Sequence, residues 1–125
     1  MTFAQKKASI SFLQGLRENG IISPRLFAEQ FRVDLETLAD LAHVPPEAIS
    51  HVPESELLQD YMRNAASVIS TLLESSDLDI ERAITWFRHA PLIELGGATA
   101  ERYVSLGRTA AVHAYALNLA VGATG

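Results

Sequence analysis

The segment from Glu54 to Glu74 constrains the fold most, because its apolar residues recur at every third or fourth position. That spacing places them along one face of a helix, and no other part of the chain shows it as clearly. We therefore expect this segment to be the central core helix. Its apolar face comprises Leu57, Leu58, Tyr61, Met62, Ala65, Val68, Ile69, Leu72 and Leu73.

Capping residues and helix breakers divide the rest of the chain into shorter helices. No segment alternates apolar and polar residues as a half-buried strand would. We predict an all-α fold of seven or eight helices, with regions 1–75 and 76–125 joined in one compact unit. The expected helices span 2–19, 24–31, 35–42, 46–52, 54–74, 80–89, 99–107 and 108–121, and the other residues expected to face the core are Phe3, Ile10, Leu13, Leu16, Leu35, Leu38, Leu41, Ala42, Val112, Tyr115, Ala116 and Leu119.

The composition limits the classes of function. The 125 residues include no cysteine, which excludes disulfides and cysteine metal sites and is compatible with a reducing compartment. A formal net charge of −5 disfavours general affinity for nucleic acids, because attraction to phosphates supplies most non-specific binding. The weakly polar run from Thr109 to Ala123 is too short to span a bilayer. We expect a cytoplasmic protein that makes no contact with a membrane.

The stretch from Ile80 to Gly107 has the most distinctive series of helix-stop and helix-start residues. Its first helix should stop at Pro91, which has no N–H and restricts the residue before it. Gly96-Gly97 permits backbone conformations that side chains forbid, and Thr99 is a good N-cap. The order predicts a helix, a tight exposed loop and the start of a second helix.

This order resembles the C-terminal toxin-binding domain of the Xre/MbcA/ParS antitoxin family. The family pattern is a Trp-bearing helix, a Pro-containing segment, Leu-Gly-Gly-x-Thr-Pro and a helix that leads to a Gly. Here it reads as Trp86, Pro91, Leu95–Thr99 and Gly107. The proline usual after the threonine is Ala100. Because alanine is an excellent helix former, we expect the helix start to survive and the loop to be less rigid.

The resemblance implies an antitoxin rather than an enzyme, with no cofactor. Its partner would be a RES-domain toxin, an enzyme that degrades NAD or transfers its ADP-ribose to a protein, and the antitoxin would block the NAD cleft. Family members also often form homodimers, assemble further with the toxin and bind their own promoter DNA. The toxin-binding residues that the resemblance implies are Leu92, Leu95, Gly96, Gly97, Thr99, Arg102, Tyr103, Gly107 and Arg108, with the C-terminal residues 123–125 as a further candidate.

Residues 34–52 have the spacing of a helix-turn-helix, with Ala39, Val44, Ile49 and Val52 at the packing positions. The second helix, 46–52, has no Arg or Lys, and His43 stands where Gly is usual in the turn. The motif therefore predicts the fold more strongly than it predicts DNA binding. A transcriptional regulator, or a family member that has lost its toxin, stays open as an alternative. Candidate DNA contacts are Lys6, Lys7, Arg17, Arg25, Arg32, Ser50 and His51.

No arrangement typical of catalysis or metal binding is present in the sequence. The four histidines show no paired ligand spacing, and Gly96-Gly97 lacks the surroundings of a phosphate loop. The aromatic pair Trp86-Phe87 could anchor a partner, but adjacent helical residues point about 100° apart. We expect Phe87 in the core and Trp86 at its edge.

Overall fold

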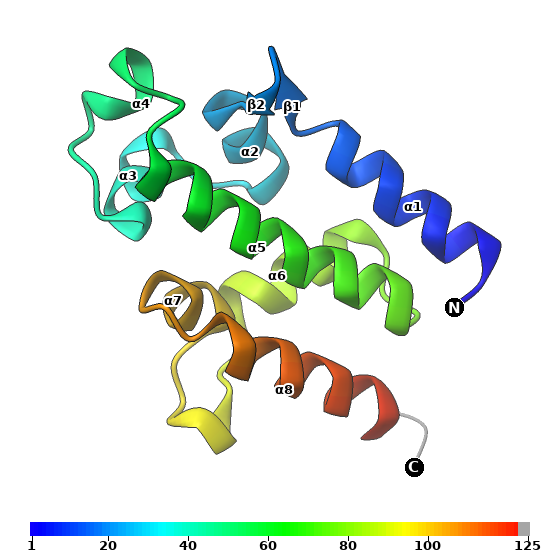
Figure 1. The fold of residues 1–125 in the computed structure, drawn as a ribbon. Helices are drawn as coiled ribbons and strands as arrows, with labels where there is room; N and C mark the ends of the chain where they lie inside the picture. The colour runs from blue at the N-terminus through cyan, green and yellow to red at the C-terminus, as the bar shows by residue number, and fades with distance from the viewer. Residues whose placement is uncertain (123–125) are drawn as a thin grey trace.

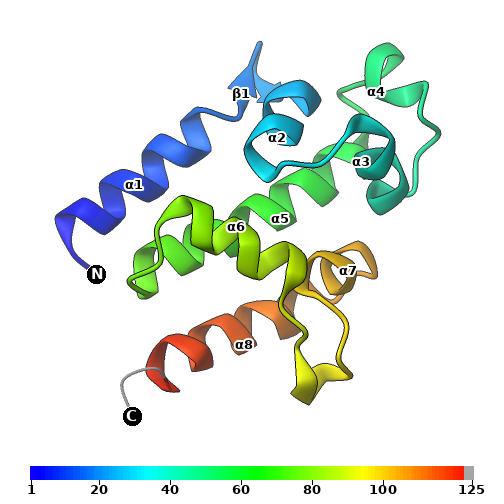
Figure 2. The same ribbon diagram turned by 180° about the vertical axis from the view of Figure 1, so that it is seen from behind.

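The fold is all-α apart from one small hairpin, as a computed structural model that describes residues 1–122 shows. Helix α5 lies between α1 and α8, and α6 crosses behind it (Figures 1 and 2). The helices are α1 (Phe3–Gln14), α2 (Pro24–Phe31), α3 (Leu35–Ala42), α4 (Ala48–His51), α5 (Glu56–Ser75), α6 (Ile80–His89), α7 (Ala100–Ser105) and α8 (Thr109–Gly122), with a 3-10 turn η1 (Ile93–Leu95) and strands β1 (Arg17–Glu18) and β2 (Ile21–Ile22).

Helix α5 is the central helix, as the sequence predicted. Eight of its nine predicted apolar positions are buried, and only Leu57 is exposed. Leu57 lies in the first turn of the helix. The phenol of Tyr61 is buried in this core, and its burial raises the pKa far above the ordinary value.

Four phenylalanines join the helices around α5. The rings of Phe27 and Phe31 are stacked with centroids 4.0 Å apart. Phe31 also meets Phe87 edge-on at 5.6 Å and Phe12 at 6.0 Å. Because Phe12 is on α1, Phe31 on α2 and Phe87 on α6, a single apolar core extends through both predicted regions.

The prediction for the N-terminal segment was wrong in two ways. Helix α1 ends at Gln14 rather than near residue 19, because Asn19 and Gly20 adopt positive φ angles of 54° and 82° and form the turn of the β1–β2 hairpin. The side chain of Gln59 then holds Ile22 by bonds of 3.1 and 2.8 Å to its N–H and carbonyl. Phe3 and Ile10 are exposed, and α1 instead buries Ser9 and Phe12.

The helix-turn-helix spacing was correct for three of its four packing positions and wrong for Val52 and for the extent of the second helix. Ala39 and Ile49 are buried and Val44 packs against the core, but Val52 is exposed, as is Leu35. The expected helix 46–52 is reduced to α4, four residues without a side-chain cap. His43 adopts the left-handed conformation at φ 60°, where Gly is usual, and its Nε2 lies 2.8 Å from the Ser105 carbonyl oxygen. That contact offsets part of the conformational cost.

Candidate protein-binding surface

The loop between α6 and α7 is closed at its base by hydrogen bonds. Asp79 caps α6 by accepting from the N–H of Arg82 at 2.9 Å, and the helix ends just before Pro91, as predicted. Pro91 and Thr99 then lie opposite each other in a β-bridge, and the N–H of Leu92 donates to the Ala98 carbonyl at 2.9 Å. The two ends of the loop are therefore fixed side by side.

The hydroxyl of Tyr103 holds the tip of this loop from inside. It donates to the Leu95 carbonyl at 2.7 Å and accepts from the N–H of Ala98 at 3.2 Å. Gly96 has φ 122°, and a Cβ there would lie 2.8 Å from the tyrosine oxygen. Gly97 has φ 92°. Both glycines are therefore required by the backbone conformation, and Gly96 also by space.

Helix α7 is fixed to the body of the protein on two sides. Arg88 donates from Nε to Glu101 at 2.9 Å and from a terminal nitrogen to the Arg32 carbonyl at 2.7 Å. On the other side, Ser105 donates from Oγ to the Leu41 carbonyl at 2.6 Å. Thr99 caps α7, so a helix starts there with alanine rather than proline at position 100, as predicted. The loop thus stands on a well-braced helix.

Apolar and cationic side chains project from this rigid frame. Ile93 at the loop and Leu106 after α7 are 70% and 58% exposed. The guanidinium of Arg108 lies over the Tyr103 ring, 4.9 Å from its centroid. Arg102 is exposed and reaches only a loose contact of 3.9 Å with Asp40. The loop with these four side chains and the groove described next is called the α7 face.

A groove of about 650 Å³ separates the loop from α8. Its lining is mainly apolar, and the loop stands out beside α8 at this position (yellow in Figure 1). At its rim the hydrogen bond from Tyr115 lowers the pKa of the Glu94 carboxyl, and the same contact raises the pKa of the Tyr115 phenol. The groove is lined by Glu94, Leu95, Ala111, Ala114, Tyr115, Asn118 and Leu119.

Helix α8 buries less of its surface than the sequence predicted. Val112 and Ala116 are fully buried, but Tyr115 is half-buried and Leu119 is exposed. The helix is apolar nearly all round while only one side packs on α5 and α7, so periodicity does not identify its inner face. Trp86 lies at the edge of the core, 6.3 Å from the Tyr115 ring, and Phe87 is fully buried, as predicted.

The predicted toxin-binding residues divide into a supporting set and an accessible set. Leu92 and Tyr103 are buried and shape the loop, and Leu95 and Thr99 are half-buried. Residues 123–125 lie outside the described part of the chain. Sequence reasoning included Ile93 only as part of the loop 92–99 and missed Leu106, although an apolar residue directly before a glycine such as Gly107 is a usable signal. The accessible members are Gly96, Gly97, Arg102, Gly107 and Arg108.

The candidate DNA contacts do not form one surface. Lys6 and Lys7 lie on α1, at the opposite end of the molecule from Ser50 and His51 on α4 (Figure 1). Two of the arginines are engaged with carboxylates, Arg25 with Glu18 and Glu29 and Arg32 with Glu81, and Arg17 lies in β1. A phosphate backbone would therefore meet scattered and partly neutralised cations.

The histidine contacts that the structure shows join one helix to another. His113 of α8 lies 2.9 Å from Ser67 and 3.1 Å from Thr71 of α5. Within residues 1–122 no group of three or more acidic or histidine side chains is placed to hold a metal ion. Among the described helices, none has the length and apolar character needed to cross a membrane.

The α7 face thus combines a braced loop, exposed apolar side chains, two accessible arginines and a groove. Only this geometry and the sequence resemblance bear on its function. In comparisons with known proteins, no family model, curated protein or solved structure matches the chain.

Proposed function

We propose that this protein is an antitoxin that binds a RES-domain, NAD-consuming toxin through the α7 face and blocks entry to the toxin's active site. The observation that carries the proposal is the exposure of Ile93, on a loop whose conformation is fixed from inside, and of Leu106 at the end of α7. The sequence resemblance selects the class of partner. The geometry supports the mode of binding.

The apolar character of the face favours a protein partner. Ile93 precedes Glu94 of the groove wall, Leu106 follows α7, and α8 adds exposed Leu117 and Leu119. Exposed apolar patches mark interaction surfaces in soluble proteins. Arg102 and Arg108 place two accessible positive charges on this face of an acidic chain, which suits carboxylates on the rim of a partner's cleft.

The rigidity of the loop favours occlusion as the mechanism. A protruding loop that is already ordered loses little conformational entropy when it enters a cleft. That order exists before any partner arrives, because it comes from Tyr103, from Gly96 and from the β-bridge between Pro91 and Thr99 at the base of the loop. A plug of this kind inhibits by excluding the substrate, so it needs no catalytic group of its own.

The proposal is tested by co-expressing the chain with the protein encoded beside it and measuring NAD consumption. We expect stoichiometric capture and suppressed NAD loss with the wild type. The double variant Ile93→Asp/Leu106→Asp should lose both, because charges would replace the two most exposed apolar contacts. Leu57→Asp is the matched control, since Leu57 is similarly exposed but lies at the start of α5.

Two results would contradict the proposal. One is full inhibition by a folded Ile93→Asp/Leu106→Asp variant, which would remove the α7 face from the mechanism. The other is the absence of both binding and any effect on NAD, which would leave the resemblance without a functional meaning. Binding of the chain to DNA upstream of its own gene, without toxin, would favour the regulator instead.

A further inference from the structure

A groove of about 430 Å³ lies over α5, between α1 and α8. Figure 1 shows these two helices on the two flanks of α5. The residues that line the groove come from α5 itself, from both flanking helices and from the β1–β2 hairpin. This volume is within the range of sites that bind small molecules. The groove shares no residue with the α7 face.

The floor of the groove is apolar. Leu16, Ile22 and Ala66 are buried, and Leu13 of α1 is half-buried beside them. An alkyl or aromatic group that enters the groove would therefore exchange water for contact with hydrocarbon.

The hydroxyl groups of the wall are already engaged within the protein. Ser67 donates to the carbonyl three residues earlier at 2.8 Å, so it accepts from Nε2 of His113 at 2.9 Å. In the neutral imidazole, Nδ1 of His113 then accepts from Thr71 at 3.1 Å. Ser70 donates to the carboxylate of Glu74 at 3.0 Å. The hydroxyl hydrogens of the wall are thus used, which leaves the arginines as donors for a ligand.

Two arginines line the groove, and no Asp or Glu is among the described residues that do so. Arg17 of β1 is exposed and has no ion-pair partner in the described part of the chain. Arg63 of α5 contacts Asp60 at 2.6 Å. Together these three side chains leave one positive charge uncompensated. The planar guanidinium group has a geometry that matches a carboxylate.

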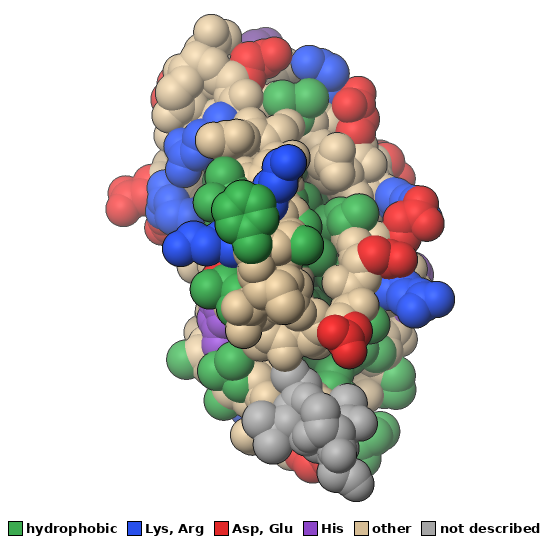
Figure 3. Space-filling model, turned by 90° about the vertical axis from the view of Figure 1, so that its right-hand side faces the viewer, with side chains coloured by type: hydrophobic (Ala, Val, Ile, Leu, Met, Phe, Trp, Pro, Cys, Tyr) green, Lys and Arg blue, Asp and Glu red, His purple; other side chains and the backbone are tan. Residues whose placement is uncertain are grey.

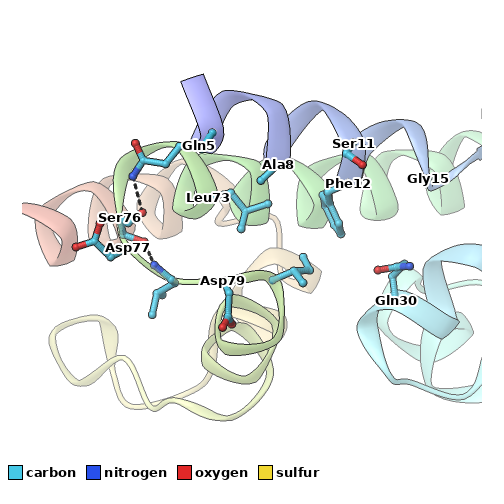
Figure 4. Close-up of a pocket in the computed structure, with 13 residues that line it drawn as sticks. Gln5, Ala8, Ser11, Phe12, Gly15, Gln30, Leu73, Ser76, Asp77 and Asp79 are labelled. Atoms are coloured by element: carbon cyan, nitrogen blue, oxygen red, sulfur yellow. Dashed lines mark hydrogen bonds between the residues drawn. The ribbon is translucent and has the colours of Figure 1, made fainter. Parts of the chain in front are cut away.

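Other parts of the surface do not offer this combination. The chain has 15 acidic and 10 basic side chains, and on the face drawn in Figure 3 Lys and Arg lie close to Asp and Glu. Figure 4 shows another groove, of about 600 Å³, into which Ala8, Phe12 and Leu73 point. Its charged lining residues in the described chain are Asp77 and Asp79. That groove is also apolar, but it should repel an anion.

We infer that the groove over α5 binds a small organic carboxylate with an apolar body. The carboxylate is held by the guanidinium groups of Arg17 and Arg63, and the body lies on the floor beside Leu13. One negative charge matches the one uncompensated positive charge. A phosphate monoester would bring nearly two charges and would need donors that the wall does not supply. The inference does not rest on the proposed antitoxin function.

Isothermal titration calorimetry of the full chain with octanoate tests the site. We expect saturable binding of one octanoate, with a dissociation constant of about 1 mM or lower. The dissociation constant should rise when salt is increased from about 50 to about 500 mM, because the charges are screened. Octanamide keeps the body without the charge, and acetate keeps the charge without the body. Each should bind at least about 10-fold more weakly.

Substitutions locate the bound octanoate. Arg17→Gln and Arg63→Gln should each raise the dissociation constant at least about 10-fold, because a charge-assisted hydrogen bond is lost. Both side chains are exposed, so circular dichroism should stay unchanged. Arg82→Gln is the matched control, since Arg82 is an exposed arginine that does not line the groove. Ala8→Trp, which narrows the groove of Figure 4, should also leave the affinity unchanged.

Three results would overturn the inference. The first is the absence of saturable binding up to about 10 mM octanoate. The second is octanamide that binds as tightly as octanoate, and the third is retained affinity in both Arg17→Gln and Arg63→Gln. The titration contains no toxin, so its failure would leave the antitoxin proposal untouched. Conversely, full toxin inhibition by Ile93→Asp/Leu106→Asp would refute that proposal without changing the octanoate titration.

Discussion

Removal of one hydroxyl should loosen the loop of the α7 face while the fold is preserved. Tyr103→Phe keeps the buried ring but deletes the donor to the Leu95 carbonyl and the acceptor for the Ala98 N–H. Each neutral hydrogen bond contributes roughly 1 kcal/mol net, and partly buried groups left unpaired cost more, so we expect a loss of about 1–3 kcal/mol. For a chain of this length, that corresponds to a fall in Tm of roughly 3–10 °C.

Hydrogen exchange followed by mass spectrometry locates the effect. The amides from Leu95 to Ala98 should exchange faster in Tyr103→Phe. The exchange rates of amides in the middle of α5 should change only as much as the change in global stability requires. Affinity for the proposed toxin partner should fall about 10-fold, because the loop would have to be ordered on binding. Tyr61→Phe is the matched control, since no hydrogen bond of the Tyr61 hydroxyl is found among the described residues. Unchanged exchange in the loop and an unchanged Tm would refute the reasoning.

Three further predictions follow from single contacts. Gly96→Ala should lower stability by about 1–3 kcal/mol in chemical denaturation, because the new Cβ meets the Tyr103 oxygen at 2.8 Å in a backbone conformation with positive φ; a neutral result would show that the loop can open. Arg88→Met and Glu101→Gln should each cost about 1–3 kcal/mol, since the pair is only 22% and 14% exposed, and the double variant should cost less than their sum; strict additivity in the cycle would contradict this. The pKa of Asp34 is lowered by its bonds to Thr37, so its contribution to stability is present above the pKa of the unfolded chain and is lost as pH falls through the folded value. Asp34→Asn should flatten that acid limb in denaturation curves, and an identical limb in both proteins would exclude Asp34 as its source.

Most of the helices could be predicted from local signals in the sequence. Asp34, Asp79 and Thr99 each cap one of the predicted helices, because a cap needs only a side-chain oxygen and the next turn. Pro91 stops α6 for an equally local reason. The Asn19-Gly20 hairpin was also readable, since this dipeptide is the strongest short hairpin signal, but the residues up to Asn19 were assigned to a helix.

The surfaces depend on contacts that no local pattern contains. Phe3 and Phe12 are the same residue type on one helix, and only the position of α5 decides that Phe12 is buried and Phe3 exposed. Likewise, the α7-face groove exists because α8 packs with one side while the rest of an almost uniformly apolar helix stays open. The predicted loop residues were correctly located in sequence, but their division into support and accessible surface required the position of Tyr103.

The place of α5 between α1 and α8 has a consequence for biosynthesis. Met62, Ala65, Val68 and Ile69 are fully buried, and Val112 and Ala116 of α8 help to cover this helix. A nascent chain therefore exposes an apolar strip of α5 until α8 has been synthesised and has left the ribosome. A chain terminated before α8 should be bound by chaperones or degraded.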